Sequence, residues 1–192
     1  TRMYPQYVPV PNVLLDKPSI RPRLDEERLN VCYSPTHTKG GRWSAKTSKD
    51  FENSLKLIEG LPRVNLISIS QPITPATLLS LRRFTHLSID EIVTGAFHQV
   101  SLESLLCGNI TVNGADYFSL MTFADCLGAD PEEIPFQHTT PAGLIDLIYE
   151  LARSPGETRK LQRLAFEFAE KYLASHSTGK IFCDIYESLS AN

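Results

Sequence analysis

The chain has 192 residues, 42% of them hydrophobic, so it can bury a sizeable core, and we expect one globular domain with a small appended segment. The formal charge of −3 comes from interspersed acidic and basic residues, which leaves no basic footprint for a nucleic-acid partner. The sequence has no apolar run of about 18 residues, as a membrane helix needs, and begins without the apolar core of a secretory signal. We therefore expect a cytoplasmic protein.

Residues 1–28 contain closely spaced prolines, which favour extended backbone over helix. We predict that this segment is an interdomain linker or edge segment and that residues 29–192 form the domain. Within the domain, Leu29–Ser34 predicts a first strand, because it is apolar, contains aromatic and β-branched residues and ends at Pro35. A polar loop then carries four basic residues, Lys39, Arg42, Lys46 and Lys49.

Helices and strands alternate after this loop. A helix is expected from Asp50 to Gly60, and a second begins at Thr74, whose side chain can cap a helix that has Pro75 at its first position. A third helix is predicted over Ser101–Cys107, with Ser101 able to cap and Glu103 in the first turn. The further strands are predicted over Val64–Ser70, Leu87–Ile89 and Ile110–Val112.

The remaining third of the chain is mostly helical. Tyr117–Leu127 is apolar enough for a helix, whereas Ile134–Phe136 is too short to place. Three closing helices are expected: one after Thr140, one opened by a capping box formed by Ser154 and Glu157, and one over 178–189.

This order predicts an α/β fold, a Rossmann-like parallel sheet with helices on both faces and extra C-terminal helices, because parallel strands need helical crossovers. Ligands of such folds bind at the carboxyl ends of the strands, which the loops after Ser34, Ser70 and Ile89 reach. There the basic loop would bring mobile cations, and the stretch Gly95–Glu103 would bring the unpaired amides of a helix start. Cations and helix-start amides suit a diphosphate, and a carboxylate beside them can accept hydrogen bonds from the hydroxyls of a sugar. Together these groups would fit a ribose diphosphate.

Each of these residues also has a plainer interpretation. The cations are more often part of a solvated loop than of a ligand site, and Glu103 would be favoured near a helix start by the dipole alone. His98 could be a surface histidine, and we expect Asp90 to tie its loop by side-chain to backbone hydrogen bonds. The cysteines, which lie far apart, are predicted to be reduced thiols, and the histidines have no metal-ligand spacing, so no metal site is predicted.

Common cofactor and catalytic motifs are absent from the sequence. No G-x-G-x-x-G follows a strand, and neither a P-loop nor a G-x-S-x-G elbow occurs, so no bound cofactor is predicted. The loop after Ser34 resembles a flavin-phosphate loop only weakly, which leaves a flavodoxin-like domain as a distant alternative.

The order of these features resembles the nucleotide-sugar-binding half of group 1 (GT4-like) glycosyltransferases of the GT-B fold. The likeness extends over 29–189. It rests on the strand and loop at 31–35, Lys46 ahead of a helix, the strand at 64–70, the residues 89–92 (IDEI) followed by Gly95, and the segment 101–112, SLESLLCGNITV. The tail, from Ser154 through Glu170 and Ser175 to Tyr186, is similar to the closing helices of that family.

The resemblance implies roles for matching residues. Glu103 falls on the glutamate that holds the donor ribose. The amides of Val100, Ser101 and Leu102 fall on the pyrophosphate-binding helix start. Lys46, or alternatively Lys39, falls on the lysine that neutralises the phosphates. Arg42 and His98 complete the candidate substrate-binding set, and no catalytic residue is assigned. Gly95 stands where the family has its first glutamate, so the contacts to the donor sugar must differ or activity must be weakened.

The resemblance also implies a function. The chain would be a metal-independent donor-binding domain that binds a nucleotide sugar and transfers its sugar to a glycan or lipid-linked acceptor in cell-surface polysaccharide assembly. A GT-B enzyme has two such domains, so we expect an N-terminal acceptor-binding domain in the same protein, through which the enzyme could associate peripherally with a membrane. The alternatives are a sugar-nucleotide 2-epimerase of the same fold and a degenerate, non-catalytic scaffold domain.

Overall fold

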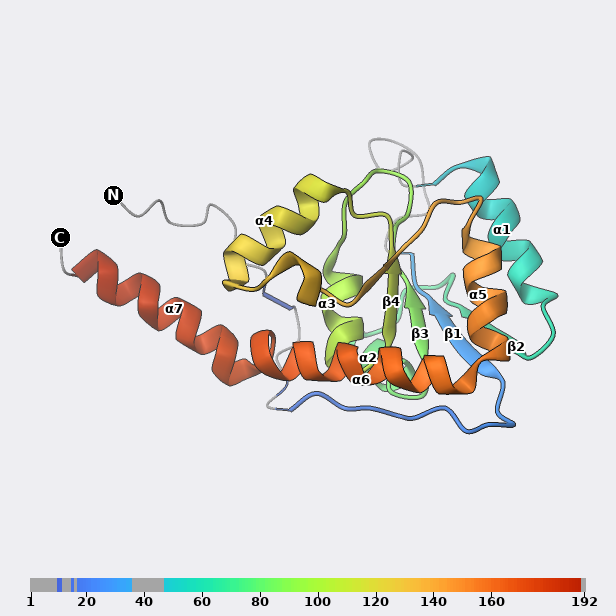
Figure 1. Ribbon diagram of the computed structural model, residues 1–192, viewed down its shortest axis with the longest axis horizontal. Coiled ribbons are helices and arrows are strands. Elements are labelled where there is room, and N and C mark those ends of the chain that lie inside the picture. The colour runs from blue at the N-terminus through green and yellow to red at the C-terminus, as the bar shows by residue number, and fades with distance from the viewer. Residues whose placement is uncertain (1–9, 12–14, 16, 36–46, 191–192) are drawn as a thin grey trace.

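The structure is a computed structural model that describes residues 10, 11, 15, 17–35 and 47–190. Five parallel strands form one sheet in the order β2-β1-β3-β4-β5 (Figure 1). The predicted α/β fold with a Rossmann-like parallel sheet is therefore confirmed. The strands are β1 (Leu29–Tyr33), β2 (Val64–Ser68), β3 (Leu87–Ile89), β4 (Ile110–Asn113) and β5 (Phe136–His138).

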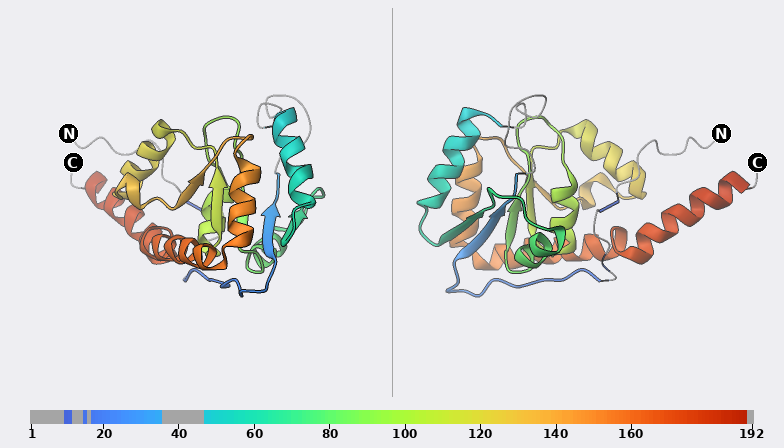
Figure 2. Two further views of the ribbon diagram at one scale, coloured as in Figure 1. Left: turned by 45° about the vertical axis from the view of Figure 1, so that its right-hand side comes forward. Right: turned by 180° about the vertical axis from the view of Figure 1, so that it is seen from behind.

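Seven α-helices and one short 3-10 helix, η2 (Pro131–Glu133), are found in the described part of the chain. Helices α1 and α5 lie side by side on one face of the sheet, α2 and α3 cover the other, and α6 crosses the molecule at the amino-terminal ends of the strands (Figures 1 and 2). The α-helices are α1 (Lys49–Glu59), α2 (Pro75–Arg82), α3 (Gln99–Leu106), α4 (Tyr117–Leu127), α5 (Leu144–Arg153), α6 (Pro155–Tyr172) and α7 (Ser175–Ser190).

Several predicted helix starts can be compared with the structure. Thr74 caps α2 as predicted, because its hydroxyl accepts the amide of Thr77 at 3.2 Å. The prediction of a capping box at the start of α6 was wrong, because the side chain of Ser154 caps no amide and Glu157 instead pairs with Lys160. The strand β5, which the sequence left unplaced, has only three residues, none of them fully buried.

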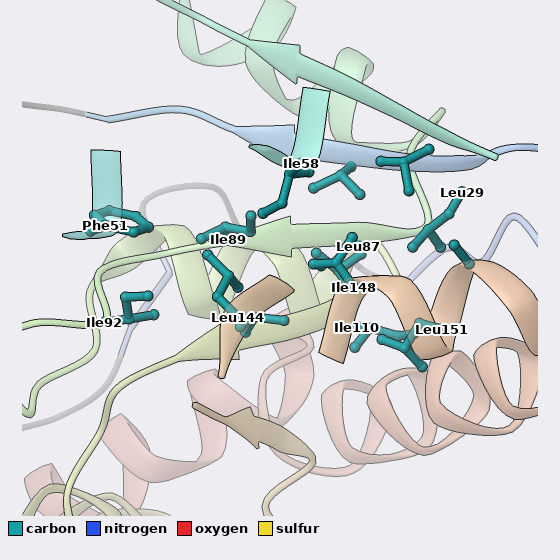
Figure 3. Close-up of a cluster of buried hydrophobic side chains, with 14 residues drawn as sticks. Leu29, Phe51, Ile58, Leu87, Ile89, Ile92, Ile110, Leu144, Ile148 and Leu151 are labelled. Carbon is teal, nitrogen blue, oxygen red and sulfur yellow. The ribbon is translucent and has the colours of Figure 1, made fainter. Parts of the chain in front are cut away.

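The hydrophobic core has one cluster on each side of the sheet. Figure 3 shows the first, in which α1 and α5 pack on the apolar side chains of β1, β3 and β4. The second joins α3, α4 and α6 through residues such as Leu105, Phe123 and Phe168. The sheet face toward α3 is polar by contrast, since Ser88, Thr111 and Asn113 are buried there.

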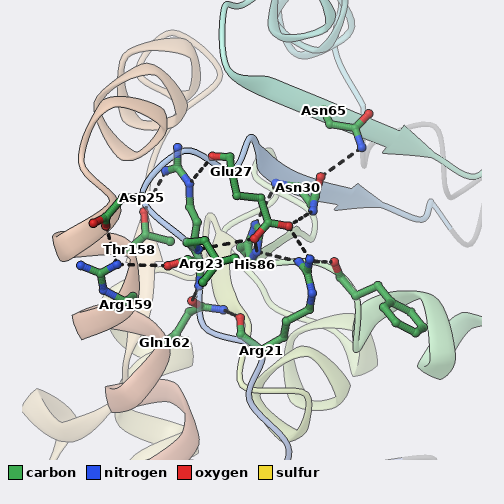
Figure 4. A network of polar contacts seen from close by, with 12 residues as sticks. Arg21, Arg23, Asp25, Glu27, Asn30, Asn65, His86, Thr158, Arg159 and Gln162 are labelled. Carbon is green, nitrogen blue, oxygen red and sulfur yellow. Dashed lines mark hydrogen bonds and ion pairs between the residues drawn. The ribbon is translucent and has the colours of Figure 1, made fainter.

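Residues 17–28, which we call the N-terminal strap, run past the amino-terminal ends of the strands into β1 (Figure 1). The strap is held by the buried Arg23, whose guanidinium donates to the carbonyls of Leu151 and Ala152 in the last turn of α5. Figure 4 shows its further contacts with Glu27 of the strap and Thr158 of α6. A cation at a helix C-terminus satisfies carbonyls that have no partner within the helix. The described part of the predicted linker segment thus packs closely against the domain.

Candidate functional site

A cavity of about 250 Å³ lies at the carboxyl-terminal edge of the sheet. The loops after β1, β2 and β3 all contribute to it, as predicted from the topology, together with the starts of α1 and α3. β1 and β3 are neighbours in the sheet, and their connections leave in opposite directions, which is where ligands of parallel α/β sheets bind. The lining residues are Tyr33, Ser34, Pro35, Thr47, Phe51, Glu52, Leu55, Ser68, Ser70, Ile89, Asp90, Glu91, His98 and Val100.

One wall of the cavity is aromatic and aliphatic. Tyr33, at the end of β1, packs edge-on against Phe51 of α1, with ring centroids 5.6 Å apart. Burial raises the pKa of the Tyr33 phenol to about 12, so its hydroxyl keeps its proton at neutral pH. Sequence reasoning placed Phe51 in a helix and Tyr33 in a strand, but did not place either at a site. An aromatic wall of this kind can pack against the planar ring of a ligand.

Asp90 is a buried residue of the cavity lining and directly follows β3. Its carboxylate oxygen Oδ2 accepts the backbone amide of His98 and the hydroxyl of Ser101, each at 2.7 Å. Burial acts to raise the pKa of Asp90, but the hydrogen bonds from His98 and Ser101 outweigh it and hold this pKa below its ordinary value. The predicted tie between Asp90 and its loop is therefore confirmed.

These contacts also correct the predicted start of α3. The helix begins at Gln99, two residues earlier than expected, with His98 at the N-cap position, and Ser101 does not cap it, because its hydroxyl donates to Asp90. Of the three residues whose amides were predicted to bind pyrophosphate, Val100 lines the cavity, whereas the side chains of Ser101 and Leu102 are fully buried.

Glu103 lies in the second turn of α3 and not in the first, which is a further correction. Its carboxylate pairs with the guanidinium of Arg82, a fully buried residue of α2. The second terminal nitrogen of Arg82 donates to the hydroxyl of Ser34 at 2.9 Å, and Ser34 lines the cavity. The partner of Glu103 is therefore Arg82, which lies 21 residues earlier in the chain. Nothing in the sequence pattern indicated this pair.

The described lining of the cavity carries negative charge. Asp90, Glu91 and Glu52 contribute three carboxyl groups, and Glu91 accepts the amides of Val93 and Thr94. The predicted phosphate-binding cations Lys39, Arg42 and Lys46 lie outside the described residues. Whether they face the start of α3 stays a prediction.

Gly95 lies at the bend between β3 and α3, as expected, with a φ of 80°. Its carbonyl accepts the amide of Asp116 at 2.7 Å and the hydroxyl of Ser119 at 2.8 Å, which joins this bend to the start of α4. A side chain at position 95 would begin 3.1 Å from the carboxylate of Asp116. A glutamate at this position would therefore lie beside another acid.

A second hollow, of about 240 Å³, lies on the other side of this bend. Ala96 and Phe97 form one wall of it, and α4 provides the opposite wall. Phe118, at the rim, is 77% exposed.

The described residues contain no helix that is both long and apolar enough to cross a membrane. In the same part of the chain, no three histidine, cysteine or acidic side chains are grouped so that they could hold a metal ion.

Comparison with known proteins supports the fold. No family model matches the sequence, and no curated protein matches it either. Among solved structures, the chain is similar to Anabaena Alr3699/HepE, crystallised in complex with UDP and glucose, with a TM-score of 0.58 and 15% sequence identity. The similarity covers 86% of this chain and 49% of that one, so the chain spans about half the length of this neighbour. At this identity the likeness shows the fold alone.

Proposed function

We propose that the chain is the nucleotide-sugar-binding half of a glycosyltransferase of the GT-B fold. The observation that carries this proposal is the cavity between the ends of β1 and β3, in a fold similar to that of a protein crystallised with UDP and glucose. The aromatic wall formed by Tyr33 and Phe51 suits a nucleobase, and the exposed carboxylate of Glu52 can accept hydrogen bonds, which sugar hydroxyls can donate.

In this proposal the diphosphate lies at the start of α3. The first amides of a helix and its positive dipole end stabilise negative charge, and this charge grows on the diphosphate as the sugar leaves. Lys39, Arg42 and Lys46 would add mobile cations. The acceptor, a glycan or a lipid-linked sugar in cell-surface polysaccharide assembly, would be bound by an N-terminal domain of the same protein, which could also contact the membrane.

Calorimetry on this chain with UDP-glucose and GDP-mannose tests the proposal. We expect one of them to bind with a dissociation constant of about 1 mM or lower. Ser70→Trp should abolish the binding, because Ser70 is an exposed residue of the cavity lining and an indole there would occupy space that the ligand needs. Ser80→Trp is the matched control, since Ser80 is exposed on α2 and does not line the cavity. Absence of binding, or equal binding by both variants, would refute the proposal.

One specific observation favours a second candidate, a scaffold domain whose site has decayed. The carboxylate of Glu103 is already paired with Arg82, and Gly95 supplies no carboxylate at all. Such a domain would have no affinity for nucleotide sugars, so the same titration separates the two candidates.

A further inference from the structure

The pair formed by Asp90 and His98 carries an inference that rests on the proposed function and deepens it. His98 lines the cavity, and its side chain is 30% exposed, whereas that of Asp90 is only 5% exposed. The ring nitrogen Nδ1 of His98 lies 3.5 Å from Oδ1 of Asp90. One side of the imidazole thus faces a buried carboxylate, while part of the ring reaches the cavity.

The carboxylate of Asp90 is fixed in place. Its other oxygen, Oδ2, is occupied by the amide of His98 and the hydroxyl of Ser101, so the group cannot turn without breaking two hydrogen bonds. A carboxylate that faces Nδ1 favours a proton on that nitrogen, which leaves Nε2, on the far side of the ring, as the nitrogen that gains a proton when the ring becomes cationic. The contact with Asp90 therefore holds the ring in one orientation at the wall of the cavity.

The charges around the cavity strengthen this argument. The titratable groups that face it are Tyr33 from β1, Glu52 from α1, and Asp90 and Glu91 after β3. Among the lining residues that the structure describes, His98 is the one whose side chain can carry positive charge. Among these described residues, an anion bound in the cavity could therefore form a charge-assisted hydrogen bond with His98.

We propose that His98, oriented by Asp90, contacts the diphosphate of the nucleotide donor and that protonation of its ring strengthens donor binding. Histidine is the side chain whose charge changes between pH 5 and 8, so the site would bind its donor more tightly in mildly acidic conditions. Asp90 is a positioning residue in this arrangement. It holds both the ring and the first turn of α3, against which the diphosphate would lie.

The test is the affinity for UDP-glucose at pH 6.0 and pH 8.0, with circular dichroism to confirm folding at both. UDP-glucose is a better probe than UDP, because its diphosphate is esterified at both ends and has no terminal phosphate that titrates near pH 6. We expect binding about tenfold tighter at pH 6.0, the effect of one charge-assisted contact. His98→Gln should bring this ratio close to one, and Asp90→Asn should reduce it.

Two control variants accompany these substitutions. His176→Gln changes an exposed histidine of α7, and His37→Gln changes a histidine of the basic loop; both should keep the tenfold ratio. Three results would overturn the inference and leave the proposed function intact. The ratio of the affinities at pH 6.0 and pH 8.0 could be near one in the wild type, it could stay near ten in His98→Gln, or it could fall to one in His37→Gln. If UDP-glucose and GDP-mannose both fail to bind at either pH, the proposed function fails, and the inference fails with it.

Discussion

The buried guanidinium of Arg82 on α2 is paired with the carboxylate of Glu103 on α3 and joins it to Ser34 at the edge of the cavity. The pair lies on the polar face of the sheet. The Nε atom of Arg82 makes no hydrogen bond to the described residues, so one donor of the guanidinium has no acceptor among them. Such a pair links the positions of α2, α3 and the loop after β1 more than it adds stability.

Arg82→Met is therefore expected to lower the free energy of unfolding by about 3–5 kcal/mol, because it leaves Glu103 buried and charged without a partner. The double variant Arg82→Met with Glu103→Leu should recover most of this loss, since both partners are then apolar. Urea denaturation measures both changes. Arg83→Ala is the control, because Arg83 is the next residue and is exposed. Equal stability of Arg82→Met and wild type would contradict the prediction.

The pair also illustrates what the sequence could and could not predict. The strand Leu87–Ile89 was predicted with its observed bounds, because two apolar residues that alternate with a polar one ahead of a polar loop are a local signal. The start of α3 was predicted too late, because the residue before the helix, His98, is held through its amide by Asp90, eight residues earlier, and no capping side chain at the helix start marks the boundary. The partner of Glu103 could not be predicted at all, since contacts between two helices depend on how both pack on the sheet.

His86, at the start of β3, is fully buried and neutral, and its Nδ1 accepts the amide of Asn30 at 3.0 Å (Figure 4). Burial lowers the pKa of His86 to about 4, although Glu27 acts in the opposite direction. Since an unfolded histidine has a pKa of about 6.5, the unfolded chain binds the extra proton between these values, and stability falls as the pH falls through this range.

We expect the free energy of unfolding to drop by about 2 kcal/mol between pH 7 and pH 5 through His86 alone. Urea denaturation at a series of pH values measures this loss. His86→Gln should be less stable at pH 7, but its stability should change less over the same interval. The prediction is wrong if wild type and variant show parallel pH profiles.

Arg23 holds the N-terminal strap to the last turn of α5, and its backbone also contacts α6, since Arg159 donates to its carbonyl at 3.2 Å. Arg23→Met should cost about 2–4 kcal/mol, because the substitution removes the buried charged hydrogen bonds to the carbonyls of Leu151 and Ala152. The strap should also become sensitive to limited proteolysis before β1 is cleaved. Arg28→Ala changes an exposed arginine of the same segment and should have little effect on either measurement.

Gly108 and Gly128 form a matched pair, because both end a helix with a φ of 63°. A Cβ atom at Gly108 would lie 2.4 Å from the carbonyl oxygen of Ser19 in the strap, whereas a Cβ at Gly128 meets no atom within 4 Å. Gly128→Ala should therefore cost only the strain of a left-handed residue, about 1–2 kcal/mol. Gly108→Ala adds a clash between the new methyl group and the backbone of the strap, so we expect a loss of more than about 3 kcal/mol in thermal or urea unfolding. Equal losses for the two variants would mean that the strap does not lie against the end of α3.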